Sequence, residues 1–477
     1  MNDIVNSKTT GDQPTTSFRD QLATVDAKGK RKWIYALRPK GKLYNIRTWV
    51  SWFFFLLFFG LPFIKVNGRP LFLFNITQAK FIIFGKIFWP QDFFIFGLGM
   101  VAFIIFIVLF TAAFGRLFCG WVCPQTIFME MLFRKVEYWI EGDAGKQRLR
   151  NNGPWTPEKI RIKITKHLAF YILSFIIANF FLAYIIGADQ LYKIITEPVS
   201  EHAGGFISII IFSGVFYGVY AWFREQVCTV VCPYGRLQSV LLDRNSMIVA
   251  YDYKRGEPRG KYKKNKSAEL ITGDCIDCFQ CVKVCPTGID IRNGTQMECV
   301  GCTACIDACN KMMDAVGKSR GLIRYASENG ISEGKHIRYT GRMKFYTALL
   351  VLIAGLLTLL LISRKDVDGT IVRAPGQLYQ ERGTDSLSNL YTIKVVNKTL
   401  DDIPLTLKLQ DLPGRIVETE GKDILVKKED QGKGSFFVVL PRTQISKRKT
   451  VLTIGLYQHD KLITTISTNF MGPFNRF

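Results

Sequence analysis

Residues 275–286 read CIDCFQCVKVCP, and residues 299–309 read CVGCTACIDAC. Each stretch has three cysteines separated by two residues and a fourth after three more, which is the spacing of bacterial ferredoxins. In two-cluster ferredoxins the fourth cysteine of each run binds the other cluster. The spacing therefore predicts two [4Fe–4S] clusters, one on Cys275, Cys278, Cys281 and Cys309, the other on Cys299, Cys302, Cys305 and Cys285.

A pair of zinc sites is the alternative, because paired C-x2-C motifs also bind zinc. Zinc takes four ligands per site and leaves no role for the third cysteine of each run. Iron–sulfur binding is therefore favoured. The second run is followed by Asn310 where the first has Pro286, and this difference does not change the assignment.

The composition of the chain indicates a membrane protein. Its 477 residues are 48% hydrophobic, include 37 phenylalanines and carry a net charge of +24. With this hydrophobic content, the charge points to basic loops beside membrane spans and to no nucleic-acid partner. All 12 cysteines lie between residues 119 and 309, clustered at metal-binding spacings, which favours redox use in a reducing compartment over disulfides.

Five apolar segments are predicted to cross a bilayer, because each is near the ~20 residues required. None contains Asp, Glu, Lys or Arg, and they cover residues 48–64, 93–115, 167–187, 205–223 and 345–362. Residues 71–89 are also apolar, but Lys80 and Lys86 interrupt them. An interfacial or re-entrant stretch is expected there.

Lysine and arginine counts orient the spans. The tail 1–47 has ten and residues 125–166 have nine, whereas residues 67–92 have three and residues 188–204 have one. Basic loops stay in the cytoplasm, so the N-terminus is expected inside and the region after the fifth span outside. The basic run within residues 254–266 is expected to be a solvated linker or to lie on anionic headgroups.

Five regions follow from these observations. They are a cytoplasmic basic tail (1–47), a four-helix membrane region (48–243), a cytoplasmic linker with a two-cluster ferredoxin-like α+β module (244–344), a fifth membrane helix (345–362) and a C-terminal domain (363–477). Short β-branched runs between turn residues predict that the last region is a β-sandwich. It shows no catalytic constellation, and its lone His459 is expected to be an exposed surface residue.

The remaining four cysteines form two matching motifs. Residues 114–124 read FGRLFCGWVCP and residues 223–233 read FREQVCTVVCP, so the pattern C-x3-C-P is duplicated. Residues four apart share a helix face, and proline ends or kinks the helix. Both motifs follow spans that run in the same direction, which predicts one shared site at the cytoplasmic surface. Its members are Cys119, Cys123, Cys228 and Cys232.

Soft thiolates at such a site would select Cu(I), zinc or iron–sulfur. The alternative is that these cysteines are buried and inert, but the repetition of the whole motif favours metal binding. Arg116 and Arg224 are expected nearby, where they would favour thiolates. Met129 and Met131 could add soft ligands, although packing is their favoured role.

These elements in this order resemble the cytochrome c oxidase accessory family CcoG, also called FixG or RdxA. The resemblance covers nearly the whole chain. It implies a multi-pass protein of the bacterial inner membrane with an immunoglobulin-like C-terminal domain in the periplasm. It also implies reduction of Cu(II) to Cu(I) for assembly of a cbb3-type oxidase, with Cys119, Cys123, Cys228 and Cys232 as the copper-site thiols.

The expected function is therefore that of a membrane-bound electron conduit with cupric reductase activity. Its expected partners are an unidentified cytoplasmic electron donor, oxidase subunits or copper chaperones, and membrane lipid. Two alternatives stay open. One is a quinol dehydrogenase of the NapH type, which shares these motifs but usually ends near the ferredoxin; the other is a non-enzymatic scaffold that docks oxidase subunits.

Overall fold

The computed structural model divides the chain into two compact units, Met1–Leu357 and Thr358–Phe477. It describes residues 23–25, 28–76, 79–198, 200–261, 273–334, 339–364, 367–376, 378–383, 385–419, 424–445, 447–458 and 461–473. Most of the N-terminal tail, the end of the basic run and His459 lie outside the described residues.

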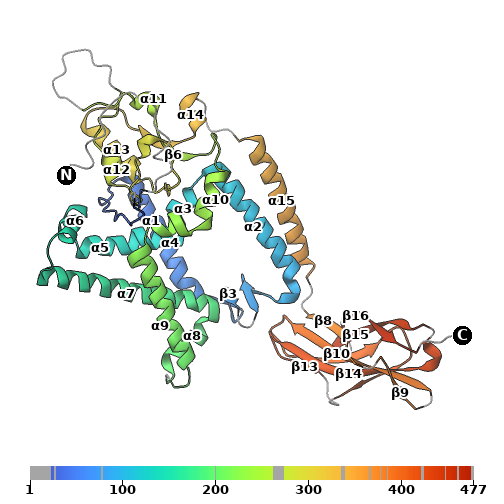
Figure 1. Ribbon diagram of the computed structural model, residues 1–477. Helices are drawn as coiled ribbons and strands as arrows, with labels where there is room; N and C mark the ends of the chain where they lie inside the picture. The colour runs from blue at the N-terminus through green and yellow to red at the C-terminus, as the bar shows by residue number, and fades with distance from the viewer. Residues whose placement is uncertain are drawn as a thin grey trace. The chain divides into compact units, whose positions relative to one another are not determined.

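Within the described part of the chain, five helices are long and apolar enough to cross a membrane, as predicted. They contain α1 (Lys42–Gly60), α2 (Phe93–Phe114), α7 (Pro157–Ile186), α9 (Ala203–Gly218) and α15 (Gly341–Ile362). The third is longer than expected because Thr156 caps it, accepting a hydrogen bond from the Lys159 N–H at 3.2 Å. Helices α7 and α9 pack together, as Figure 1 shows.

Residues 71–89, expected to be an interfacial or re-entrant stretch, have regular structure, and their place relative to the membrane stays a prediction. They form a three-stranded antiparallel sheet of β3 (Phe72–Asn75), β4 (Lys80–Ile83) and β5 (Lys86–Phe88), with β3 against α7. Phe84 and Gly85 both have positive φ, 51° and 72°, which is the geometry of a two-residue hairpin turn. A turn of this kind pairs the strands on either side of it.

The ferredoxin-like module follows α10 (Pro233–Leu241). Strand β6 (Ile248–Tyr251) pairs antiparallel with β7 (Ile323–Ala326), and the two cysteine runs lie between them with helices α12 (Gln280–Lys283) and α13 (Ala304–Ala315). Its core contains buried apolar residues from these elements and several cysteines. The two strands thus close a loop of chain that carries every ferredoxin-type cysteine.

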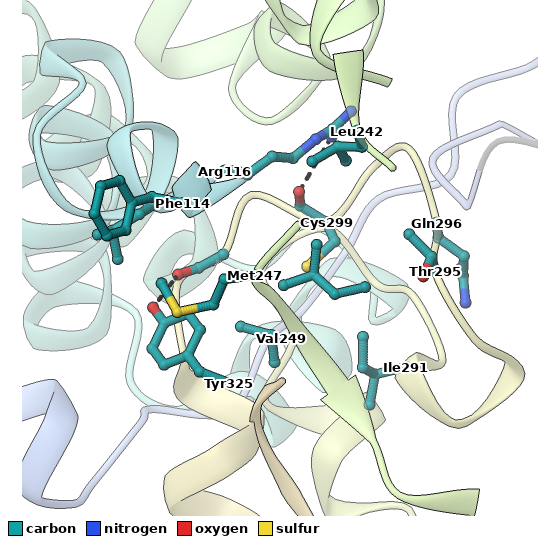
Figure 2. Close-up of a pocket in the computed structure, with 13 residues that line it drawn as sticks. Phe114, Arg116, Leu242, Met247, Val249, Ile291, Thr295, Gln296, Cys299 and Tyr325 are labelled. Carbon is teal, nitrogen blue, oxygen red and sulfur yellow. Dashed lines mark hydrogen bonds between the residues drawn. The ribbon is translucent and has the colours of Figure 1, made fainter. Parts of the chain in front are cut away.

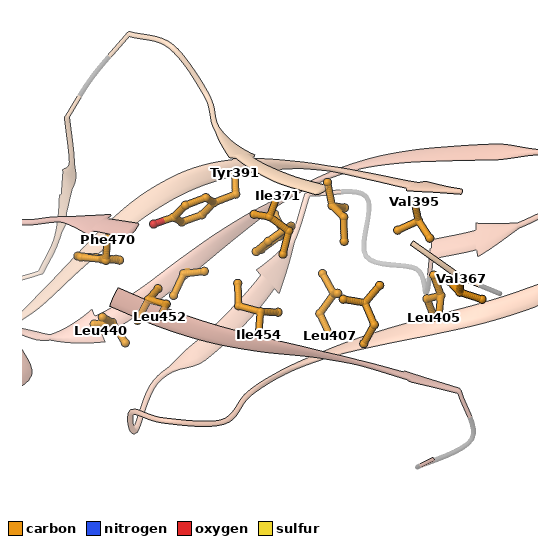
Figure 3. Close-up of a cluster of buried hydrophobic side chains, with 14 of the residues drawn as sticks. Val367, Ile371, Tyr391, Val395, Leu405, Leu407, Leu440, Leu452, Ile454 and Phe470 are labelled. Atoms are coloured by element: carbon orange, nitrogen blue, oxygen red, sulfur yellow. The ribbon is translucent and has the colours of Figure 1, made fainter. Parts of the chain in front are cut away.

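The C-terminal unit consists of two antiparallel sheets, so the prediction of a β-rich domain is confirmed. One sheet has the order β12-β14-β10-β8 with β9 beside β10, and the other has the order β13-β11-β15-β16. Their bounds are β8 Val367–Arg373, β9 Gln380–Arg382, β10 Ser386–Asn397, β11 Ile403–Leu409, β12 Arg415–Glu418, β13 Ile424–Val426, β14 Gln431–Pro441, β15 Lys449–Gln458 and β16 Lys461–Met471. Buried side chains from both sheets form one core (Figure 3), in which Tyr391, Ile393 and Val395 alternate along β10.

Candidate iron–sulfur centres and membrane thiol site

The structure gathers the cysteines that were assigned to the first cluster. Cys275, Cys281 and Cys309 are buried in the core of the ferredoxin-like module. The Cys309 and Cys278 side chains act electrostatically on Cys281, and Cys278 and Cys275 act on Cys309. Cys309 comes from α13, whereas the others come from the first run, so these contacts follow the predicted crossed pattern.

The cysteines assigned to the second cluster line one cavity. Its walls include Cys285 from the first run and three cysteines of the second run, Cys299, Cys302 and Cys305. Cys281 of the other set also lines this cavity, so the two sets of cysteines are adjacent.

The backbone repeats the same conformation in both runs. The residues on either side of the middle cysteine have left-handed φ values, 52° and 56° at Asp277 and Phe279, and 68° and 64° at Gly301 and Thr303. Successive N–H groups in such turns form concave anion sites, as found around iron–sulfur centres. Accordingly, the Gly301 N–H is directed at the Cys299 sulfur.

Burial raises the pKa of these thiols, to about 11 for Cys302 and to about 12 for Cys281 and Cys309. Without a metal they remain protonated at neutral pH, so metal binding must displace their protons. Two adjacent sets of four soft donors, buried or half-buried, fit two [4Fe–4S] clusters. The assignment of individual ligands stays a prediction.

In each C-x3-C-P motif the helix stops before the proline, which is one of the two predicted outcomes, but the two cysteines do not share one helix face. Cys119 lies on the short helix α3 (Leu117–Trp121) and Cys228 on the π-helical turn η6 (Val227–Val231). Cys123 and Cys232 instead precede new helices, whose first residues are Pro124 of α4 (Pro124–Ile127) and Pro233 of α10. Proline is favoured at this position because its missing N–H is not needed there.

The duplication extends to the backbone. Gly115 ends the helix before the first motif with φ 56° and ψ −126°, and Arg224 occupies the equivalent place with φ 51° and ψ −121°. Glycine adopts this conformation easily, whereas arginine in it is strained, as is common at functional sites.

The four motif cysteines converge through reciprocal contacts. The Cys119 thiol donates to Gln238 Oε1 of α10 at 3.3 Å, and Thr126 of α4 lies 4.0 Å from Cys228 Sγ. The helix that follows each motif thus touches the first cysteine of the other motif. Cys119 is also influenced by Cys123 and Cys232, and Cys228 by all three others. This convergence is what a single site requires, but metal binding there stays a prediction.

Of the two arginines expected to favour thiolates, Arg116 acts on Cys119 in the expected direction, but burial outweighs it. Burial, with a further contribution from Cys123, raises the pKa of Cys119 to about 11, and Arg116 lowers it only in part. Burial likewise raises the pKa of Cys228 to about 12. Arg224 instead pairs with Glu137 and lies over Trp33, with its Cζ 5.0 Å from the ring centroid.

The two methionines pack as expected. Met129 and Met131 are buried in an aromatic core between the helices, which includes Phe133 stacked on Tyr220 at 4.4 Å. Met131 Sδ lies 3.9 Å from the Thr48 hydroxyl. This environment accounts for both methionines without a metal.

The Glu137→Gln variant is expected to lose about 3–5 kcal/mol of unfolding free energy, because it leaves the buried Arg224 charge without its partner. Burial alone would raise the pKa of Glu137, but Arg224, Lys166 and Arg134 together hold it below its usual value. The stabilisation from the Glu137 ion pair is therefore complete above the ordinary carboxyl pKa, and it is lost as pH falls through the lowered pKa of Glu137 in the folded protein. Thermal unfolding in detergent across pH measures both effects, and exposed Glu158→Gln is the matched control.

The first C-x3-C-P motif packs against the second ferredoxin-type cysteine run through its backbone. A Cβ on Gly120, beside Cys119, would lie 2.5 Å from the Gly301 carbonyl oxygen, beside Cys302. Trp121 donates to the Tyr325 hydroxyl at 3.1 Å, and that hydroxyl lies 3.4 Å from the Gly301 carbonyl oxygen.

Two arginines form hydrogen bonds at this contact between the first C-x3-C-P motif and the second cysteine run, which we call the junction. Arg116 Nη1 donates to the Cys299 carbonyl at 3.1 Å (Figure 2). Its Nη2 donates to the Gly235 carbonyl at 2.9 Å. Arg47 Nε donates to the Gly120 carbonyl at 2.7 Å. Sequence reasoning missed Gly120, Arg47 and Gln238. Only Gly120 carried a signal, as a glycine in one motif where the other has Thr229.

Three family models match the chain. A 4Fe–4S dicluster domain covers residues 223–328, which include all eight ferredoxin-type cysteines, and a 4Fe–4S binding domain covers residues 96–147. The third, the Ig-like fold at the C-terminus of FixG, covers residues 357–473.

Several relatives share much of the chain. RdxB of Cereibacter sphaeroides is 32% identical over 463 residues, which are 91% of this chain and 96% of RdxB. RdxA of the same organism is 33% identical over 363 residues, 73% of this chain and 75% of RdxA. The nitrogen fixation protein FixG of Rhizobium meliloti is 37% identical over 310 residues, 62% of this chain but only 58% of the length of FixG.

A crystal structure of a FixG-related protein from Vibrio parahaemolyticus matches 23% of this chain and 97% of its own, at 17% identity and a TM-score of 0.20. The matches to RdxB and RdxA, together with the FixG-type C-terminal domain, show that this chain belongs to the FixG/RdxA family, also named CcoG, and is an iron–sulfur electron-transfer protein of the membrane.

Proposed function

We propose that the protein passes electrons from a cytoplasmic donor through its ferredoxin-like module to the four-cysteine membrane site, where Cu(II) is the substrate and is reduced to Cu(I). The observation that carries this proposal is the backbone contact between Gly120 and Gly301. It joins the residue after Cys119 to the residue before Cys302. Because the rate of electron transfer falls steeply with distance, this close approach favours transfer between the two cysteine sites.

The junction is held by buried groups, which favours a fixed module over a mobile shuttle. Asp307, between Cys305 and Cys309, accepts the backbone N–H groups of Leu43 and Tyr44 at 3.2 Å and 2.8 Å. It thereby caps the first turn of membrane helix α1 with a carboxylate from α13, which is favourable at a helix N-terminus.

The chemistry of the thiol site suits Cu(I). When bound, the two iron–sulfur clusters supply one-electron carriers. Each Cu(II) takes one electron, and the Cu(I) product prefers soft thiolates. Cys119 and Cys228 are protonated at neutral pH, so binding of Cu(I) to their sulfurs releases protons to the cytoplasmic side in the proposed topology. Delivery to a cbb3-type oxidase is supported by the family resemblance.

The test is anaerobic reduction of Cu(II) by the full-length protein, reduced and freed of excess reductant. About eight irons per chain and about two Cu(I) formed per chain are expected, because two clusters each donate one electron. A Cu(I)-specific chelator and an iron assay measure the two quantities. An iron content near four, stoichiometric zinc, or full iron without Cu(I) formation would contradict the proposal.

A second prediction concerns topology. The N-terminus and the ferredoxin-like module are expected in the cytoplasm and the C-terminal domain in the periplasm of the inner membrane, because basic loops stay inside. A reporter enzyme that is active only in the periplasm should be active when it is fused after Phe477. Activity of a cytoplasm-dependent reporter at the same position would mean that one of the five helices does not span.

A further inference from the structure

We propose that Arg47 and Arg116 raise the reduction potential of the cluster held by Cys285, Cys299, Cys302 and Cys305 above that of its neighbour. This makes the cluster nearest the membrane thiols the preferred resting place of an electron. The inference deepens the proposed function and rests on it for the direction of electron flow, but not on copper chemistry.

Arg47 brings a buried positive charge to this cluster site. Its side chain, on α1, is only 2% exposed. Nε is held by the Gly120 carbonyl at 2.7 Å, and Gly120 packs against Gly301, the residue before Cys302. Nη2 has no hydrogen-bond partner among the described residues. Apart from burial, Arg47 is the largest influence on the pKa of the Cys302 thiol, and it lowers that pKa.

Arg116 approaches the same site from the end of α2. It is 8% exposed and donates to the carbonyls of Met297 and Cys299, at the start of the second cysteine run, as Figure 2 shows for Cys299. Its charge lowers the pKa of the Cys299 thiol.

Neither arginine forms an ion pair with a carboxylate in the described part of the chain. Two carboxylates oppose them: Glu298 acts on Cys299 and Glu130 on Cys302. Each has a smaller effect than the arginine at the same cysteine. Glu130 is itself paired with Arg134 at 3.3 Å. At Cys299 and Cys302 the arginine therefore outweighs the carboxylate that opposes it. The nearby Asp307 carboxylate is compensated by the N–H groups of Leu43 and Tyr44 at the start of α1.

The other cluster site has arginines whose charge is compensated. Arg292, beside Cys281, forms ion pairs with Asp277 at 2.5 Å and with Asp290 at 2.6 Å. Arg255, which acts on Cys309, is paired with Asp274. A paired charge presents a dipole, whose field falls faster with distance than that of a lone charge.

The difference matters because reduction adds one negative charge to a buried cluster. A nearby uncompensated cation stabilises that charge, and net charge is one of the properties that set the potential of an iron–sulfur centre. Electrons arriving at the Cys275 set would therefore move to the set beside Gly120.

Potentiometric titration of the full-length protein in detergent, followed by electron paramagnetic resonance without copper, tests the inference. Cys278→Ser and Cys302→Ser assign the two signals. In the unmodified protein the signal altered by Cys302→Ser should titrate at the higher potential. Arg47→Gln should lower that potential by about 59 mV, which is a tenfold change in the one-electron equilibrium constant, and leave the other signal unchanged.

Arg47→Lys is the matched control, because it keeps the charge and loses the guanidinium geometry. Its potential should stay closer to that of the unmodified protein than to that of Arg47→Gln. If Arg47→Gln does not fold, Arg116→Gln should shift the same signal in the same direction. Equal shifts of both signals, no shift, or an equal fall in Arg47→Lys would overturn the inference. A selective fall in potential in Arg47→Gln, together with no Cu(II) reduction by the unmodified protein, would support the inference and contradict the proposed function.

Discussion

Replacing Cys119 and Cys123 together by serine is expected to abolish high-affinity Cu(I) binding as completely as replacing all four motif cysteines. The reason is the reciprocal arrangement, in which Gln238 contacts Cys119 and Thr126 lies beside Cys228. Two thiolates alone form a much poorer soft-metal site than four. The affinity should fall by at least about 100-fold, since loss of supporting groups alone costs 10–100-fold. Competition with a chromophoric Cu(I) chelator measures it.

The reciprocal pair, Cys228 and Cys232 replaced by serine, should give the same loss. The [4Fe–4S] signals should survive in both variants because their eight predicted ligands lie in the ferredoxin-like module. Retention of half the copper in either variant would mean two independent sites. Unchanged copper binding after all four substitutions would make these cysteines structural, and the quinol dehydrogenase would become the better explanation.

Gly120→Ala is expected to slow Cu(II) reduction at least about tenfold while the iron–sulfur signals remain. Its Cβ would lie 2.5 Å from the Gly301 carbonyl oxygen and 2.8 Å from the Val300 carbonyl oxygen. Both obstacles are backbone atoms, so helix α3, which carries Cys119, must move away from the loop of Cys302. A displacement of about 1 Å can cost 100-fold in rate when it separates reacting groups.

Stopped-flow measurement of Cu(I) formation from the reduced protein gives this rate. Gly97→Ala is the control, because a Cβ there, on apolar helix α2, meets nothing within 4 Å. An unchanged rate in Gly120→Ala, with the control also unchanged, would show that electrons do not cross at this contact.

Much of the architecture could be predicted from the sequence because its causes are local. The thickness of a bilayer sets the length of an apolar helix, so the five membrane-length helices of the described chain were foreseen, although α1 and α7 begin earlier than predicted, at Lys42 and Pro157. Cysteine spacing reflects the geometry of a metal cluster, so the gathering of the ferredoxin-type cysteines in one module could be foreseen, while their division between two clusters stays a prediction. Alternation of apolar residues likewise predicted the β-rich C-terminal unit.

Long-range packing decided the rest. Arg224 lies four residues before Cys228, yet it forms an ion pair with Glu137 of α5 (Arg134–Ile140). A carboxylate partner offsets the cost of burying a guanidinium, and α5 supplies one. The thiols therefore keep raised pKa values that spacing alone did not suggest. The contact of Gly120 with Gly301 and the approach of Arg47 to both depend on how α1 and the ferredoxin-like module pack. Such contacts join segments far apart in the chain, and no local pattern of residues encodes them.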